Sequence, residues 1–221
     1  MFKKIFIALL FCSFAVQALN SQEWESSTCA WYHDSVVKII GDGYGGSGTV
    51  IKKVKDSSTE GYYVGWILTA SHVINSEDTL FYVYFNNGAV VKGGKVVEKS
   101  SFATDSYCDF GLIEALIPNS VKPMEISEEK VPMAAEVELA GFGTGQFRHW
   151  NAQYAGDKID GDGHIVLTWG IQGDSGGPII YEGKVIGIIC FGTGIEEYKD
   201  TRRAIVAPVH GTCVSRISQL D

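Results

Sequence analysis

The stretch Gly173-Asp174-Ser175-Gly176-Gly177-Pro178 lies between polar Gln172 and the apolar pair Ile179-Ile180. Glycine has no Cβ, so glycines on both sides of a serine let the backbone turn tightly. Such a turn exposes the Ser175 hydroxyl and directs the N–H groups of Gly173 and Ser175 into one small space. A hydroxyl beside two converging N–H donors suits acyl transfer, because the hydroxyl can attack and the donors can hold the negative charge that develops. Ser175 is therefore the candidate nucleophile; the alternative is a glycine-rich surface turn.

Two further residues suit the activation of this serine. A serine hydroxyl needs a base to take its proton as it attacks, and His72 stands where the apolar run Tyr62-to-Leu68 has just ended. A neutral imidazole needs a partner on its other ring nitrogen. Asp109 begins another apolar run, where a carboxylate is costly unless it is hydrogen-bonded. The remaining histidines are interpreted as surface or otherwise satisfied residues: His33, His149, His164 and His210.

Short β-prone runs separated by turns fill most of the chain. Candidate strands in the first half are 35–40, 47–53, 62–68, 79–85, 90–99 and 109–115, and those in the second half are 135–141, 152–159, 164–169, 178–181, 185–191 and 203–208. The stretch 119–133, with two prolines, is less regular. Six strands, a linker and six more strands predict an all-β protein of two antiparallel barrels. Periodicity alone leaves a single sandwich open, and the last residues could form a short C-terminal helix.

Two short motifs that resemble ligand loops are interpreted as turns. Residues 41–46 match Gly-x-Gly-x-x-Gly, but a dinucleotide site needs a helix next, and a β-branched alternating run follows. Residues 160–163 read Asp-Gly-Asp-Gly without helical flanks, and Ile171 occupies the position of the last calcium ligand. We expect no metal and no cofactor.

The first 18 residues have the pattern of a secretory signal peptide. Lys3 and Lys4 precede an apolar run over 5–16, and Val16-Gln17-Ala18 suits signal peptidase. The run is short for a membrane span, and a retained anchor is the alternative. We expect a secreted or periplasmic protein. Its predicted parts are a signal peptide (1–18), a lead-in (19–34), an N-terminal barrel (35–118), a linker (119–133), a C-terminal barrel (134–209) and a tail (210–221).

Charge and cysteine content narrow the partners and the compartment. A formal net charge of −8 disfavours nucleic acid and anionic membranes. We expect protein or peptide substrates, no membrane contact beyond export, and a monomer. Four cysteines lie beyond the leader and could form up to two disulfides in three connectivities. They are Cys29, Cys108, Cys190 and Cys213. Cys29–Cys213 is the favoured pair, while Cys108 and Cys190 could be buried thiols.

Three stretches, in chain order, resemble the signature sequences of chymotrypsin-fold serine peptidases. They are Leu68-Thr69-Ala70-Ser71-His72, Cys108-Asp109-Phe110-Gly111-Leu112-Ile113 and Gly173-Asp174-Ser175-Gly176-Gly177-Pro178. Gly46-Ser47-Gly48-Thr49-Val50-Ile51 is similar to the compact bacterial, HtrA-like branch. The resemblance covers about residues 35–208 and implies two Greek-key barrels with the site between them. We expect no PDZ-like domain after the last strand.

The resemblance also implies a role for each matching residue. His72 would act as general base and then acid, Asp109 would orient it, and Ser175 would attack the carbonyl. The N–H groups of Gly173 and Ser175 would form the oxyanion hole. Substrate would lie against Thr168, Trp169, Gly170, Cys190, Phe191 and Gly192.

At several positions the sequence differs from the family pattern, and each difference changes what we expect of the protein. Trp169 stands where an aspartate would select Lys or Arg, so we expect an uncharged, apolar residue before the cut. Val73 replaces a cysteine of animal relatives, and Cys190 replaces a serine that backs the catalytic acid. Lys38-Ile39-Ile40-Gly41 is similar to a zymogen activation site, but cleavage there would delete the first strand. We therefore expect activity without cleavage beyond the leader, with a partner for Asp174 other than a new amino terminus.

Taken together, the sequence favours an exported serine endopeptidase that works through an acyl-enzyme. The alternative from another class is a catalytically silent relative that binds a partner. A structural secreted domain is a third reading, and it leaves the triad of side chains unexplained.

Overall fold

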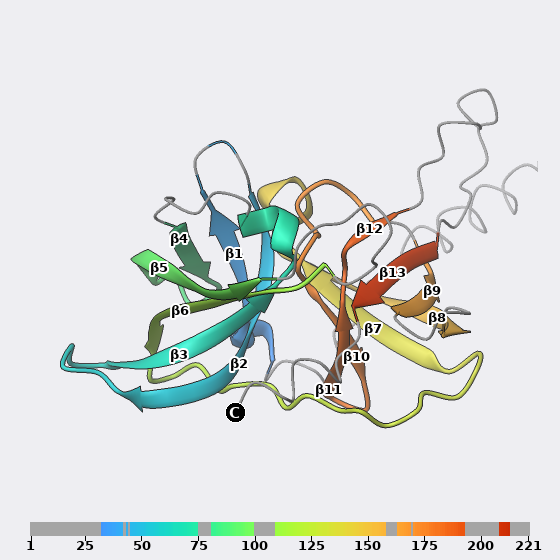
Figure 1. The fold of residues 1–221 in the computed structure, drawn as a ribbon, viewed down its shortest axis with the longest axis horizontal. Coiled ribbons are helices and arrows are strands. Elements are labelled where there is room, and N and C mark those ends of the chain that lie inside the picture. The colour runs from blue at the N-terminus through green and yellow to red at the C-terminus, as the bar shows by residue number, and fades with distance from the viewer. Residues whose placement is uncertain are drawn as a thin grey trace, which may run out of the picture. The chain divides into compact units, whose positions relative to one another are not determined.

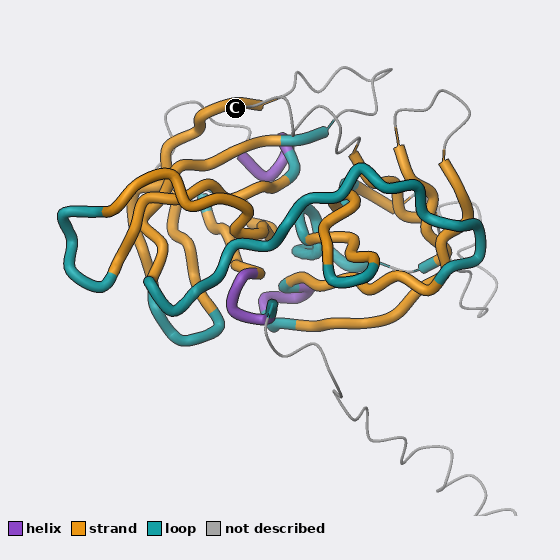
Figure 2. Tube along the Cα trace, turned by 90° about the horizontal axis from the view of Figure 1, so that it is seen from below, coloured by secondary structure: helices purple, strands orange, loops and turns teal. Residues whose placement is uncertain are grey.

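The computed structural model describes residues 32–41, 43, 45–74, 81–99, 109–157, 163–168, 170–192 and 208–212. Strands and the turns between them make up nearly all of this part of the chain, as Figures 1 and 2 show. The predicted all-β class is confirmed. Among the described residues, no helix has the length and apolar character needed to cross a membrane.

The strands and short 3-10 helices follow one another in a simple order. The strands are β1 (Val36–Ile40), β2 (Gly45–Asp56), β3 (Tyr62–Thr69), β4 (Phe81–Phe85), β5 (Val90–Lys99), β6 (Gly111–Pro118), β7 (Glu136–Gly141), β8 (Arg148–Asp157), β9 (Gly163–Leu167), β10 (Pro178–Tyr181), β11 (Lys184–Ile188), β12 (Phe191–Gly192) and β13 (Pro208–Thr212). The 3-10 helices are η1 (His33–Ser35), η2 (Ser71–Ile74) and η3 (Gly143–Gly145).

The first six strands close into an antiparallel barrel in the order β1-β2-β3-β6-β5-β4. Alternating side chains explain the closure: along β4, Phe81, Val83 and Phe85 are buried and the residues between them are more exposed. Ile40 pairs with Gly45, so β1 and β2 are neighbouring antiparallel strands, as expected from the sequence. All six strands of this barrel lie within a few residues of the predicted ranges.

The other strands form a seven-stranded antiparallel sheet in the order β11-β10-β7-β8-β9-β13-β12. It packs a second hydrophobic core that includes Val137, Leu139, Trp150 and Ile179. The two sheets give the chymotrypsin-like double-barrel architecture predicted from the sequence. The predicted C-terminal helix, residues 201–207 and residues 213–221 lie outside the described residues.

The sequence prediction differs from the structure at three strands of this sheet. One of them is β13, which spans Pro208–Thr212 and shares only Pro208 with the predicted strand 203–208. The predicted strand 185–191 is split into β11 and β12, and Ile189, between them, bonds the loop that contains Ser175. The Ile189 N–H donates to Gly177 O at 2.8 Å, and Ile189 O accepts from the Gly176 N–H at 2.6 Å. Strand β8 begins at Arg148, earlier than predicted, because its first six residues pair with the whole of β7, from Gly141 back to Glu136.

The two sheets contact each other through β7, which lies against β1 and β2 (Figure 1). Tyr32, which lies just before β1 in the chain, strengthens this contact. Its side chain is fully buried, and its hydroxyl donates to Glu138 at 2.5 Å and lies 2.8 Å from His149 Nε2. His149 is thus a satisfied histidine, as expected. The pKa of His33 is lowered, mainly by burial and to a smaller extent by the nearby His149.

The connection from β6 to β7 is bonded to both sheets. The Met124 N–H donates to Val50 O in the first barrel at 2.8 Å, and the Ser127 N–H donates to Val185 O in the second sheet at 2.9 Å. These bonds reinforce the relative position of the sheets, on which any site between them depends.

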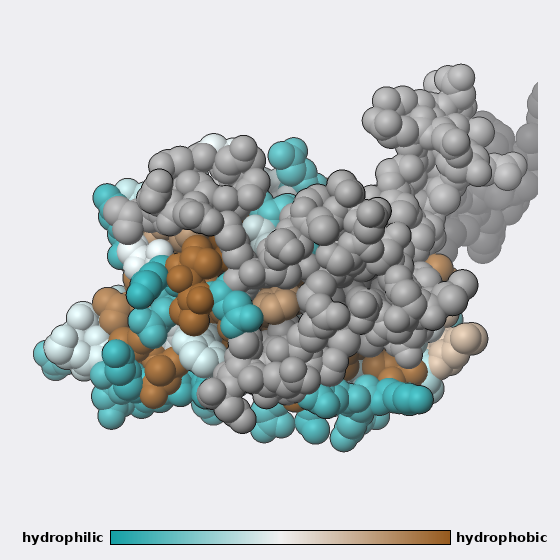
Figure 3. All heavy atoms as spheres, in the orientation of Figure 1, coloured by the Kyte–Doolittle hydropathy of each residue, from teal (hydrophilic) through white to brown (hydrophobic). Residues whose placement is uncertain are grey.

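Hydrophobic side chains on the surface are scattered. On the face in Figure 3, the brown areas of the described residues are separated by hydrophilic ones. The exposed large hydrophobic residues in this part of the chain are Val54, Tyr82, Val90, Val97, Met133, Leu167 and Ile171. Single exposed residues of this kind are ordinary for a globular protein and indicate no binding surface.

Candidate active site

The loop from Ile171 to Gly177 has a backbone that only glycine allows at two positions. Gly173 has a φ of +104° and Gly176 a φ of +85°. A Cβ on Gly173 would lie 2.6 Å from Phe142 O, and one on Gly176 would lie 2.2 Å from Ser47 O. The sequence interpretation of these glycines as the makers of a tight turn is therefore confirmed in physical detail.

Within this loop, the N–H groups of the exposed Gln172, of Gly173 and of Ser175 have no acceptor among the described residues. The N–H groups of Asp174, Gly176 and Gly177 donate to backbone carbonyls at 2.6–3.0 Å. No carbonyl or side chain in the described part of the chain accepts from the N–H of Gly173 or Ser175. Two adjacent, unpaired donors form a ready site for an anionic oxygen.

The direction of the Gly173 N–H is set from the far side of its peptide. The carbonyl of Gln172 accepts from the Thr144 N–H at 3.0 Å. In a trans peptide the N–H points opposite to the C=O, and no described peptide is cis. The Gly173 N–H therefore points away from η3, which contains Thr144.

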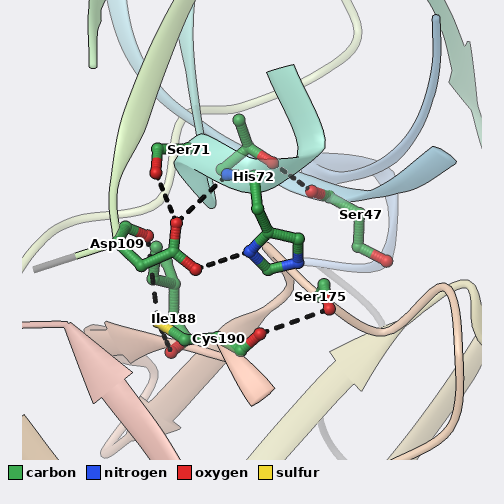
Figure 4. A network of polar contacts seen from close by, with 8 residues as sticks. Ser47, Ser71, His72, Asp109, Ser175, Ile188 and Cys190 are labelled. Carbon is green, nitrogen blue, oxygen red and sulfur yellow. Dashed lines mark hydrogen bonds and ion pairs between the residues drawn. The ribbon is translucent and has the colours of Figure 1, made fainter. Parts of the chain in front are cut away.

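His72 and Asp109 form the closest polar pair near this loop. His72 Nδ1 lies 2.5 Å from Asp109 Oδ2. The other carboxylate oxygen accepts from Ser71 Oγ at 2.5 Å and from the His72 N–H at 3.1 Å. Figure 4 shows the imidazole between Asp109 and Ser175, with its Nε2 edge facing Ser175. The Ser175 hydroxyl makes a long hydrogen bond, 3.4 Å, to Cys190 O.

The environment keeps Asp109 ionised at neutral pH. Asp109 is 1 % exposed, and this burial alone would raise the pKa of its carboxyl. Hydrogen bonds from His72 and Ser71, together with the charge on His72, outweigh burial and bring the pKa below its ordinary value. The buried Asp109 carboxylate can thus hold Nδ1 of His72 while Nε2 of the same ring faces the Ser175 hydroxyl.

Ser47, on β2, joins the first barrel to the loop of the second sheet. It is fully buried. Its N–H donates to Ser175 O at 2.7 Å, and its hydroxyl donates to Gly173 O at 2.7 Å while accepting from the Phe142 N–H at 2.8 Å. Its own carbonyl accepts from Thr69 Oγ1 at 2.6 Å. One side chain therefore fixes the peptide between the two unpaired N–H groups.

Comparison with known families identifies the chain. The trypsin-like peptidase domain matches residues 46–188, which is more than half of the sequence. The chain belongs to the trypsin-like peptidase family. Peptide-bond hydrolysis is the activity of this family, and the protein is accordingly a serine endopeptidase.

Solved structures of proteases share the fold of this trypsin-like peptidase. The inactive form of the Rv3671c protease has a TM-score of 0.60 and 22% identity, over 86% of this chain and 88% of that one. The active form of the same Mycobacterium tuberculosis protease has a TM-score of 0.61 and 22% identity, over 85% of this chain and 79% of that one. The serine endoprotease from Yersinia pestis has a TM-score of 0.64 and 17% identity, over 86% of this chain and 62% of that one.

In this trypsin-like peptidase, Arg148 supplies a cation for the buried Asp174. Asp174 is 1 % exposed, and its Oδ2 accepts from the Ile171 N–H at 2.8 Å and lies 3.7 Å from Arg148 Nη1. The guanidinium stacks over the Trp150 ring at 3.9 Å. Burial raises the pKa of Asp174, while the Ile171 N–H and Arg148 partly oppose the rise. A substitution that removes Arg148 would therefore leave the buried Asp174 carboxylate without a nearby cation, which is energetically costly.

The predicted substrate-binding residues are only partly described. Thr168 is buried, and its Oγ1 accepts from Trp150 Nε1 at 2.8 Å; Gly170 is exposed. Cys190 is a buried thiol whose Sγ lies 3.8 Å from Asp109 O, so it contacts the backbone of the acid. Phe191 and Gly192 form strand β12, at the end of the sheet. Trp169 and the proposed disulfide partners Cys29 and Cys213 lie outside the described residues.

Sequence reasoning missed four residues that organise the site: Ser47, Ser71, Thr144 and Arg148. Ser71 and Ser47 lie inside stretches that resemble those of the family, and this resemblance was the available signal. Thr144 contributes only a backbone N–H, and Arg148 meets Asp174 through sheet pairing. Neither role can be predicted from the neighbouring sequence.

Proposed function

We propose that Ser175, His72 and Asp109 form the catalytic triad of this peptidase. The Ser175 oxygen attacks the substrate carbonyl carbon while its proton passes to Nε2 of His72. The tetrahedral intermediate collapses, the C–N bond breaks and the departing amine takes the proton from His72. A water molecule, deprotonated in turn by His72, then hydrolyses the Ser175 ester. The hydrogen-bonded pair of His72 and Asp109, facing Ser175, is the observation that carries this proposal.

The N–H groups of Gly173 and Ser175 would form the oxyanion hole of this reaction. Both donors lack a partner in the described residues, so neither has to break a bond in order to receive the oxygen. The loss of one such donor costs roughly 3–4 kcal/mol of transition-state stabilisation in other enzymes. Acid and base chemistry at the triad and charge stabilisation at the hole would together account for hydrolysis without a cofactor.

A fluorophosphonate probe tests the proposal directly. Ser175 in the folded protein should displace fluoride from the probe and carry the adduct, which peptide mass mapping identifies. His72→Ala and Ser175→Ala should remain unlabelled, because the first lacks the base and the second lacks the nucleophile. Ser57→Ala, in the turn between β2 and β3, should be labelled like the parent. A parent protein that is folded by circular dichroism yet unlabelled would overturn the proposal and favour a catalytically silent binding protein.

Substrate preference and export are further parts of the proposal. We propose an uncharged, apolar residue before the cut, since Trp169 stands where the family places a selecting aspartate. Cleavage of a peptide library dominated by Lys, Arg or Glu at that position would contradict this preference. The basic start and apolar run of residues 1–18 support export to a secreted or periplasmic location.

We also propose that the peptidase is active without cleavage at Lys38-Ile39. Arg148 already offers Asp174 a cation within the second sheet, so no new amino terminus is needed there. Proteins that begin at Leu19 or carry a short extension before it should have equal kcat/KM. Arg148→Met should lower kcat about tenfold, since the uncompensated Asp174 carboxylate would displace the loop that contains Gly173.

A double-mutant cycle separates this charge effect from lost packing on Trp150. Asp174→Asn combined with Arg148→Met should recover part of the kcat lost in Arg148→Met alone, because no buried charge then lacks a partner. If the two changes simply add, Arg148 acts through its packing. An extension before Leu19 that abolishes activity would contradict the proposal of an enzyme active without processing.

A further inference from the structure

A solvent-open cavity of about 280 Å³ lies beside Gly173. Its walls come from Lys38 on β1, from Gly45 and Gly46 at the start of β2, and from loop residues that follow β7 or precede β10: Phe142, Thr144, Gly145, Gln172 and Gly173. Gly173, whose N–H has no acceptor among the described residues, is thus part of the cavity wall. Among the described lining residues, none belongs to the segment from Ile189 to Cys190.

The two sides of Ser175 differ in what they offer a peptide. On one side, the carbonyl of Cys190 lies 3.4 Å from Ser175 Oγ, and the chain continues into β12, the terminal strand of its sheet. A terminal strand can pair with an extended peptide. On the other side lies β2: Figure 4 shows Ser47 and Cys190 on opposite sides of Ser175. A peptide that pairs with β12 and crosses Ser175 must then continue over Gly46 and Gly173, into the cavity.

Lys38 gives this cavity its charge. Lys38 pairs with Ser47 across the β1–β2 ladder, so both side chains project from the same face of the barrel toward the second sheet. Its Nζ donates a long hydrogen bond, 3.4 Å, to Gly145 O across the junction of the two sheets. An ammonium group has three donors, so this contact leaves capacity for a ligand. No other charged side chain is among the described residues of the wall.

We propose that this cavity binds the segment of substrate that leaves after the cut, and that Lys38 selects an acidic side chain at the first or second residue of that segment. The proposal rests on the function proposed above, because it takes Ser175 as the point of cleavage. A half-exposed ion pair is a modest interaction, so the expected preference for glutamate over glutamine is about fivefold to tenfold in kcat/KM. The preference should weaken as salt concentration rises.

Internally quenched peptides test the selection. The peptides share the residues before the cut and carry Glu, Gln or Lys at the first or the second position after it. The parent should cleave the Glu peptides about fivefold to tenfold faster than the Gln peptides, and the Lys peptides more slowly still. In Lys38→Met the Glu-to-Gln ratio should fall to about one, and in Lys38→Glu the Lys peptides should become the better substrates. Lys55→Met, an exposed lysine on the far arm of β2, should keep the parental ratio.

Each result bears on one proposal. Equal cleavage of Glu and Gln peptides by the parent, or a preference that persists in Lys38→Met, would overturn the role of Lys38. A peptide anilide, which has no residue after the scissile bond, reports the triad separately. Absence of anilide hydrolysis and of fluorophosphonate labelling in the parent would instead overturn the proposed catalytic residues.

Discussion

Replacing Asp109 with asparagine should lower kcat about ten-thousand-fold while leaving the fold in place. The Asp109 carboxylate accepts from three donors: Ser71 Oγ, the His72 N–H and His72 Nδ1. An asparagine of the same shape offers one acceptor oxygen and one donor NH₂, so it cannot satisfy all three. An NH₂ group facing Nδ1 would favour the tautomer with its proton on Nε2, which cannot accept the Ser175 proton. An equivalent change in another triad enzyme has an effect of this size.

The same substitution should change how stability depends on pH. The pKa of Asp109 in the folded protein is below its ordinary value of 3.8. A lowered pKa means that the unfolded chain binds the proton more readily, so the carboxylate stabilises the fold above pH 3.8. That contribution is lost as pH falls through the lowered pKa. The difference in free energy of unfolding between parent and Asp109→Asn should be constant near neutral pH and shrink below 3.8.

Urea denaturation at several pH values and steady-state kinetics at pH 7 measure the two effects. Asp56→Asn is the matched control, since Asp56 lies on the exposed arm of β2 with 89% of its side chain accessible. It should leave kcat unchanged. A parental kcat in folded Asp109→Asn would exclude Asp109 as the residue that orients His72.

The sequence predicted the first barrel closely because its signals are local. Alternation in β4 and the turn at 86–88 are each fixed by a few neighbouring residues. The nucleophile loop was predictable for the same reason, as the glycines that permit its positive φ stand next to Ser175. Local sequence is sufficient where local sterics decide the conformation.

Long-range pairing explains what the sequence did not reveal. Strand β11 ends at Ile188, and the next residue bonds the loop around Gly176 and Gly177, a contact that no periodicity encodes. Arg148 meets Asp174 only because β8 begins opposite Gly141 in the β7–β8 ladder. The motifs therefore indicated which groups react, whereas the groups that hold them in position emerged from the tertiary structure.

Replacing Ser47 with alanine should lower kcat about a hundredfold with little change in KM. The Ser47 hydroxyl holds Gly173 O and the Phe142 N–H, and its loss leaves both buried backbone groups without that partner. The peptide that follows Gly173 would then be held only through its N–H, which donates to Ile171 O, and the two N–H donors on either side of it would lose part of their alignment. A misplacement of about 1 Å at a reacting centre can cost about a hundredfold in rate. Binding of the ground-state substrate depends much less on that alignment, so KM should change little.

Thr49→Val provides a matched control on the same strand. Thr49 is as buried as Ser47, but its Oγ1 has no hydrogen-bond partner within the described residues. Its replacement by the isosteric valine should therefore cost neither stability nor rate. Ser47→Ala should lose about 1–3 kcal/mol of unfolding free energy, so kcat is measured per active site titrated with the fluorophosphonate, well below the midpoint of thermal unfolding. An equal loss of kcat in both variants would mean that repacking of β2, and not the Ser47 hydroxyl, controls the geometry of the two donors. A parental kcat in Ser47→Ala would mean that the loop holds those donors by itself.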